Sequence, residues 1–162
     1  MAHDPLAVLE REIQQLQTKA AAGHTFPPNC FVSMKAEFIH YVSRTSLTVS
    51  FPVLEESLNP LRKMQGGFLT AAFDNTFGPL SYLAARCPCA TLDLHTQFIR
   101  PVNVGDIIAV TARVVSQGTD ALFLSAEAVN RRKKLVATCC ANMIILRQYF
   151  QKPAKDTPSD HR

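Results

Sequence analysis

The sequence predicts an α+β fold in which an antiparallel sheet of about five or six strands wraps around one long central helix. One helical pattern covers residues 66–85, strand-like patterns stand on both sides of it, and short connections join most of the strands. Short connections require antiparallel neighbours, and a helix that is separate from a run of strands is typical of this class. The 162 residues are enough for one domain with a substantial core.

The N-terminal part predicts one amphipathic helix followed by two strands. Asp4-Pro5 is a typical helix start, because an acid caps the helix and proline fits its first position. Apolar residues then recur every three or four positions until about Gly23. Residues 24–35 contain two adjacent prolines and predict a loop, while strands are expected over 36–42 and 47–53.

The long helix is expected to end before Cys87-Pro88, because the residue before a proline avoids the helical region. Four strands follow, at 91–99, 106–116, 121–130 and 135–146. The tail from Gln151 contains two prolines, mixed charges and almost no apolar residues, which predicts disorder. The expected organisation is an N-terminal helix at 1–23, one folded domain at 24–147 and a disordered tail at 148–162.

Composition and charge argue against several classes of protein. The net charge of +4 is mild, and no arginine-rich arm or RNA-binding aromatic motif is present, so no nucleic-acid partner is expected. No apolar run reaches the roughly 18 residues of a membrane span, and the N-terminus lacks the pattern of a signal peptide. The five cysteines are odd in number and two are adjacent, which indicates reduced thiols and a cytoplasmic protein.

No metal site is predicted. Cys87-Pro88-Cys89 has too few ligands for a zinc site without a further pair. His40 and His95 lie in strand-like segments without cysteine or acidic partners at ligand spacing. We interpret both histidines as structural or pocket-lining residues.

The candidate site lies on the 66–85 helix, where one stripe consists of small residues and a single carboxylate, Asp74. The other members of the stripe are Gly67, Thr70, Ala71, Gly78 and Ser81. A helix N-terminus carries free N–H groups and a partial positive charge, and glycine lets a ligand approach this backbone. Such a terminus suits a developing oxyanion, and Asp74 two turns later could activate a water or attack directly.

The same stripe also permits a purely structural interpretation. Asp74 could accept hydrogen bonds from a neighbouring loop, and the small residues could pack against another helix. Gly66 and Gly67 could then serve only as the turn between the loop and the helix. The spacing of an amide, the two glycines and the acid favours the functional interpretation.

Asn59, the triplet Gln65-Gly66-Gly67 and Asp74 resemble a motif of the hotdog-fold acyl-CoA thioesterases, specifically of the PaaI-like branch. That family shows Asn or Gln, a loop, His-Gly-Gly at the start of the central helix, and an acid two turns later. The stretch TLDLHTQFIRPVNVGDIIAVTARVVSQG at 91–118 is similar to the family's next two strands. The resemblance covers about residues 36–147.

The resemblance implies a role for each matching residue. Asp74 matches the general base or nucleophile, and Gly66 matches the backbone N–H that polarises the thioester carbonyl. Asn59 matches an amide that orients the carbonyl or the water, and Thr91 matches a Ser or Thr that holds the water in some members. Gln65 replaces the usual histidine. Its donor and acceptor can substitute for a loop fastener but not for a proton-transfer group.

Two features of the expected site come from the strand pattern and the substrate. Strand alternation puts Thr91 on one face with Asp93, His95 and Gln97, and puts Leu92, Leu94 and Phe98 on the other.

Coenzyme A carries anionic phosphates, for which the candidate partners are Arg62, Lys63, Arg100 and the basic run RRKK at 131–134. For the run we favour the alternative of a solvated hairpin turn, because exposed charge runs usually have no further role.

The remaining substrate contacts are expected from Gln65, Gly67 and Phe77, although Phe77 could instead pack in the core. We expect hydrolysis of an acyl- or aroyl-CoA thioester to the acid and CoA, with no cofactor besides the coenzyme A of the substrate. The resemblance implies a homodimer with the site between protomers, and a tetramer is usual in the family. The alternatives are a non-catalytic acyl-CoA or lipid-binding protein and an enoyl-CoA hydratase or dehydratase.

Overall fold

The structure is a computed structural model that describes residues 4–18 and 26–147. Its helices are α1 (Pro5–Gln17), α2 (Asn29–Ser33), the short 3-10 helix η1 (Glu55–Ser57) and α3 (Gly66–Ala85). Its strands are β1 (Glu37–Val42), β2 (Ser46–Pro52), β3 (Cys89–Phe98), β4 (Ile107–Gln117), β5 (Ala121–Asn130) and β6 (Leu135–Ile145). The tail predicted to be disordered lies outside the described residues.

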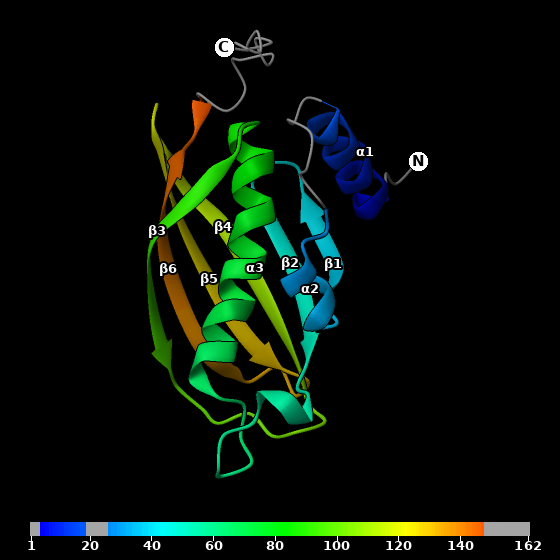
Figure 1. Cartoon of the computed structure of the whole chain (residues 1–162), viewed down its shortest axis with the longest axis vertical. Coiled ribbons are helices and arrows are strands. Elements are labelled where there is room, and N and C mark those ends of the chain that lie inside the picture. The colour runs from blue at the N-terminus through cyan, green and yellow to red at the C-terminus, as the bar shows by residue number, and fades with distance from the viewer. Residues whose placement is uncertain (1–3, 19–25, 148–162) are drawn as a thin grey trace, which may run out of the picture.

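All strands belong to one six-stranded antiparallel sheet in the order β1-β2-β4-β5-β6-β3. The sheet curls around α3, and β1 and β3 form its two edges (Figure 1). The α+β expectation, with a sheet wrapped around one long helix, is therefore confirmed.

The long helix α3 begins and ends where the sequence predicts. Its N-cap is Gln65, and Arg86 ends it in the left-handed conformation with φ of 54°. Leu69, Phe73 and Leu80 are buried against the concave face of the sheet. Each such side chain contributes about 1.5–3 kcal/mol to stability when fully buried, so core packing holds this helix in place. No helix in the described residues is long and apolar enough to cross a membrane.

The N-terminal region differs from the prediction in two places. Helix α1 ends at Gln17 with Thr18 as its C-cap, and residues 19–23 of the predicted helix lie outside the described residues. The predicted loop at 24–35 contains the short helix α2. This helix forms through tertiary contacts, because its buried Phe31 stacks on Phe38 with ring centroids 4.7 Å apart. Such contacts cannot be read from local sequence.

Candidate active site

A pocket of about 330 Å³ lies beside Asp74. It is bounded by α1, by residues 26–30, by one side of α3 and by the start of β3. Most of its lining is apolar, and the lining residues are Ile13, Leu16, Gln17, Phe26, Pro28, Cys30, Asp74, Asn75, Gly78, Pro79, Tyr82, Leu83, Cys87, Pro88, Cys89, Thr91 and Met143. Asp74 is the only acidic or basic residue among them.

Asp74 and Thr91 form a hydrogen-bonded pair on this wall. The Thr91 hydroxyl donates to Asp74 Oδ1 at 2.8 Å. Asp74 is half-buried, and no other hydrogen bond to it occurs within the described residues. The second carboxylate oxygen is therefore available to accept a hydrogen bond from a water. The structure brings these two predicted residues together.

Thr91 reaches Asp74 because β3 contains a β-bulge. Thr91 pairs with Met143 and Asp93 pairs with Asn142, so Leu92 is an extra residue in the ladder. A bulge reverses the alternation on one side of it. Thr91 therefore faces α3 although Asp93 faces away, and the prediction that both share a face is wrong.

Two further contacts show that β3 runs alongside α3 and that the end of β3 lies beside the start of α3. Thr70 on α3 donates to Thr96 Oγ1 at 3.2 Å. At the far end of the strand, a Cβ added to Gly66 would lie 3.0 Å from the ring of Phe98. Asp74 thus sits near the beginning of β3 and Gly66 near its end.

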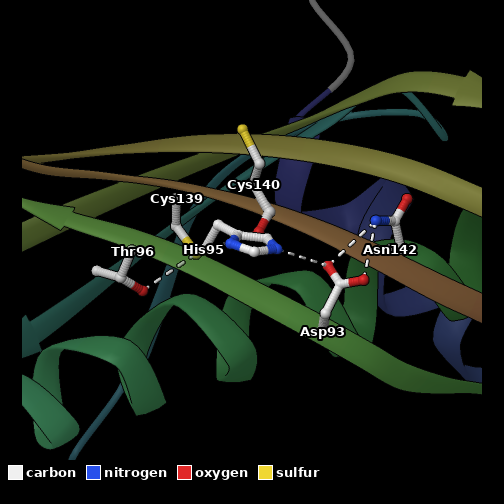
Figure 2. Close-up of polar contacts among 6 residues, drawn as sticks. All are labelled: Asp93, His95, Thr96, Cys139, Cys140 and Asn142. Carbon is white, nitrogen blue, oxygen red and sulfur yellow. Dashed lines mark hydrogen bonds and ion pairs between the residues drawn. The ribbon is translucent and has the colours of Figure 1, made fainter.

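The opposite face of the sheet carries a second polar cluster, formed by Asp93 and His95 of β3 and by Cys140 and Asn142 of β6 (Figure 2). Asn142 Nδ2 donates to both carboxylate oxygens of Asp93, at 3.1 and 3.0 Å. His95 Nε2 lies 3.8 Å from Asp93 Oδ1, and the His95 side chain is 80% exposed. Sequence analysis did not anticipate the pairing of Asp93 with Asn142. None of these four residues lines the pocket.

The start of α3 presents two N–H groups that donate to no acceptor among the described residues, those of Gly66 and Gly67. The third is capped, because Gln65 Oε1 accepts from Phe68 N at 3.1 Å. A Cβ added to Gly67 would lie 2.7 Å from Gln65 Oε1, so glycine makes room for this cap. Gln65 therefore fastens the helix start.

Asn59 closes the loop before α3. Its side-chain oxygen accepts from the N–H groups of Leu61 at 2.9 Å and Lys63 at 3.1 Å. This oxygen is occupied by the chain's own backbone. Any contact of Asn59 with a reactant must come from its amide NH₂ group.

Gly66 and Asp74 are too far apart to act on one carbonyl group within a single chain. They are eight residues apart on one helix. At a rise of about 1.5 Å per residue, this separates their backbones by about 12 Å. One chain therefore holds two halves of the predicted site rather than a whole site.

The remaining predicted contacts are engaged within the chain. Arg62 forms an ion pair with Glu55 at 2.7 Å, and Arg100 donates to the Leu135 carbonyl at 2.6 Å. The run at 131–134 is an exposed hairpin turn in which Asn130 Oδ1 accepts from two backbone N–H groups, which supports the solvated-turn alternative. Phe77 is fully buried and is not among the described lining residues, which supports the core-packing alternative.

Residues 64–137 match the model of the Thioesterase superfamily. Acyl-coenzyme A thioesterase 13 from Homo sapiens is 30% identical over 91 residues, which cover 52% of this chain and 62% of that protein. The chain thus spans less than two thirds of the length of this relative.

Two solved structures share the fold. The Escherichia coli PaaI protein from the phenylacetic acid degradation operon is 19% identical, with coverage of 88% of this chain and 96% of that chain and a TM-score of 0.74. A Streptococcus mutans protein bound to acetyl CoA is 18% identical, with coverage of 78% and 95% and a TM-score of 0.67. These likenesses confirm the hotdog-like arrangement of a sheet around a central helix.

Proposed function

We propose that the chain is a member of the thioesterase superfamily, whose model its residues 64–137 match, and that it hydrolyses an acyl- or aroyl-CoA thioester to the carboxylic acid and CoA. The observation that carries this proposal is the Asp74–Thr91 pair on the wall of an apolar pocket. The relative named acyl-coenzyme A thioesterase 13 and the fold neighbour bound to acetyl CoA support the substrate class.

In the proposed mechanism, Asp74 acts as the general base. It accepts a proton from a water whose oxygen bonds to the thioester carbon, and Thr91 holds the carboxylate in position. The carbonyl oxygen becomes an oxyanion that accepts a hydrogen bond from the Gly66 N–H. The C–S bond then breaks, and the CoA sulfur takes the proton from Asp74. Asn59 orients the reactants through its NH₂ group.

The separation of Gly66 from Asp74 within one chain supports a site built by two protomers. Strand β3 is an edge of the sheet, with Thr91 near one end and Phe98 near the other. A two-fold axis at His95 would pair the β3 strands of two copies antiparallel, and the extra residue Leu92 in each strand would then place Thr91 opposite the partner's Phe98. This arrangement would bring Asp74 near the partner's Gly66 and complete two sites per dimer.

Replacing Gly66 by proline tests the oxyanion donor. Proline lacks the N–H but fits the first position of a helix. The preceding Gln65 has φ of −69° and ψ of 139°, which suits a residue before proline. We expect Gly66→Pro to lower kcat by about 100- to 1,000-fold. Gly66→Ala is the matched control, because it adds the same Cβ beside Phe98 but keeps the N–H.

A mixed dimer tests the shared site. Chains carrying Asp74→Ala and Gly66→Pro are co-expressed with different tags, and the heterodimer is purified. A composite site predicts about half of the wild-type activity per dimer, because one of the two sites contains both intact halves. A heterodimer as inactive as the two parent homodimers would refute the composite site.

The rival functions make different demands on the same residues. A hydratase or dehydratase needs a catalytic histidine, but His95 lies on the outer face of the sheet, away from the pocket. A binding protein without catalysis would retain octanoyl-CoA without turnover.

The cytoplasmic location, the tetramer and the phosphate contacts of Arg62 and Arg100 also stay predictions. The five free thiols favour a reducing compartment.

A further inference from the structure

We propose that α1 and residues 26–30 form the far wall of an acyl-binding pocket, which selects uncharged, apolar acyl groups of medium size. The inference rests on the proposed function, because Asp74 marks the reacting end of this pocket. It goes further, because it assigns specificity to an N-terminal helix outside residues 64–137, which match the superfamily model.

The pocket extends along α3 from Asp74 toward the C-terminal end of that helix. Asp74, Gly78 and Tyr82 form one row of its lining, at intervals of four residues. This row spans about 12 Å at the rise of an α-helix. A Cβ added to Gly78 would meet no atom within 4 Å, so the space beside Asp74 is open. An acyl chain can therefore run from the carboxylate along the helix.

Helix α1 closes the end of the pocket that lies away from Asp74. Ile13 and Leu16 line the pocket and are only partly buried in the core. Leu16 also borders a smaller cavity with Leu83 and Arg86, at the last turn of α3 and its C-cap. Leu16 therefore contacts the distal end of an acyl group that begins at Asp74.

The part of the wall formed by α1 is anchored to the rest of the protein. Leu9 of α1 is 1% exposed in the core. Glu12 accepts hydrogen bonds from the Tyr41 hydroxyl at 2.5 Å and from the Ser43 hydroxyl at 2.7 Å. Burial, together with the Glu12 carboxylate, raises the pKa of Tyr41 to about 12, so this donor stays protonated. A wall anchored in this way sets a definite length for the pocket.

The lining determines the chemistry of the acyl group. Among the described residues no basic side chain lines the pocket, so a terminal carboxylate on the acyl chain would be desolvated without a partner from them. Burial raises the pKa of the Cys89 thiol to about 11, which keeps this lining group neutral. A volume of about 330 Å³ is near the lower limit of about 300–1,000 Å³ for small-molecule sites. This size favours medium-chain or aryl groups over long chains.

The test compares kcat/KM for acetyl-CoA, octanoyl-CoA and palmitoyl-CoA. The wild-type chain should prefer octanoyl-CoA, with roughly fourfold gained per methylene removed from water. Leu16→Trp shortens the pocket and should lower the ratio of octanoyl-CoA to acetyl-CoA by at least about tenfold. Leu16→Ala lengthens it and should shift the preference toward palmitoyl-CoA. Gln14→Trp is the matched control, because Gln14 is exposed on the same helix and does not line the pocket.

Binding to an Asp74→Asn background separates this inference from the proposed function. Calorimetry with octanoyl-CoA should show at least about tenfold weaker binding when Leu16→Trp is added. If the wild-type chain binds in this Leu16-dependent way but never hydrolyses the ester, the proposed function fails and the pocket stands. If hydrolysis occurs with the same acyl preference in both folded Leu16 variants, the pocket assignment is overturned and the function stands.

Cys30 gives a second readout that does not depend on a core substitution. Its thiol lies on the pocket wall and donates to Asn75 Oδ1 at 3.1 Å, whereas Cys140 is exposed on the outer face of the sheet. Octanoyl-CoA should slow maleimide alkylation of Cys30 by severalfold and leave Cys140 unaffected. Equal rates for Cys30 with and without octanoyl-CoA would contradict occupation of the pocket.

Discussion

The two faces of β3 each hold a carboxylate beside a neutral donor, yet they differ in what surrounds it. On the helix side, Asp74 accepts one hydrogen bond from Thr91 and borders a pocket. On the outer side, Asp93 accepts on both oxygens from Asn142 and lies beside the exposed His95. A search by residue type would favour the outer face, which combines Asp, His and Cys. The pocket and the available carboxylate oxygen are the reasons why we propose the inner face as the site instead.

The largest expected difference between the faces is in the loss of kcat when the carboxylate on each face, Asp74 or Asp93, is replaced. Asp74→Asn removes the proposed base and should lower kcat for octanoyl-CoA by about 100- to 10,000-fold. Asp93→Asn changes a carboxylate of the same size on the other face and should leave kcat within about twofold. Steady-state release of CoA measures both. Comparable losses in the two variants would show that the outer cluster takes part in the reaction.

A smaller difference is expected between two threonines. Thr91→Val removes the hydroxyl that donates to Asp74 and keeps the shape of the side chain. Because hydrogen bonds to charged groups contribute about 1.5–3 kcal/mol, kcat should fall by about 10- to 100-fold. Thr138→Val is the control, since Thr138 donates to Gln97 on the outer face at 3.4 Å. A Thr91→Val enzyme with wild-type kcat would reduce the Asp74–Thr91 contact to a structural one.

The smallest expected difference is in the labelling rates of two adjacent cysteines, Cys139 and Cys140, which point to opposite faces of the sheet (Figure 2). Cys139 is 1% exposed and lies 3.3 Å from Thr96 Oγ1, whereas Cys140 is exposed. Burial is the main cause that raises the pKa of Cys139 above its usual 9.0. The thiolate is the reactive form, so Cys139 should react with maleimide at least about tenfold more slowly than Cys140 at pH 8.

The sign of the pH dependence follows from the same shift. Because burial raises the pKa of Cys139, its labelling should stay slower than that of Cys140 as the pH rises, until the pH exceeds the raised pKa of Cys139. Peptide mass spectrometry after timed labelling resolves the two neighbours. Similar rates for both at pH 8 would contradict the inward orientation of Cys139.

Much of the fold could be predicted because local signals agree with the tertiary structure. Helix α3 begins at Gly66 and ends at Ala85 as expected, since a polar cap precedes it and a proline follows it closely. Strand β5 has the predicted bounds as well. The short helix α2 could not be predicted, because its main support is the packing of Phe31 on residues distant in the chain.

The geometry around the candidate site could be predicted only in part, and the reasons are again physical. The pairing of Thr91 with Asp74 depends on one extra residue, Leu92, and a bulge leaves no mark in an alternating pattern. The role of Gln65 as a helix cap required the position of its side-chain oxygen. The pocket wall on α1 joins segments about 60 residues apart, a contact that single-sequence periodicity does not encode.

The exposed edge of β3 affects the tendency of the chain to aggregate in solution. In the described part of the chain, β3 has a neighbour on one side only, and Leu92 and Phe98 are 61% and 57% exposed. An uncovered edge of this kind is a template for indiscriminate pairing and aggregation. Selection against aggregation and selection for activity would then act on the same ten residues of β3. Substitutions of the exposed edge residues Leu92 and Phe98 should therefore change the soluble yield of the protein.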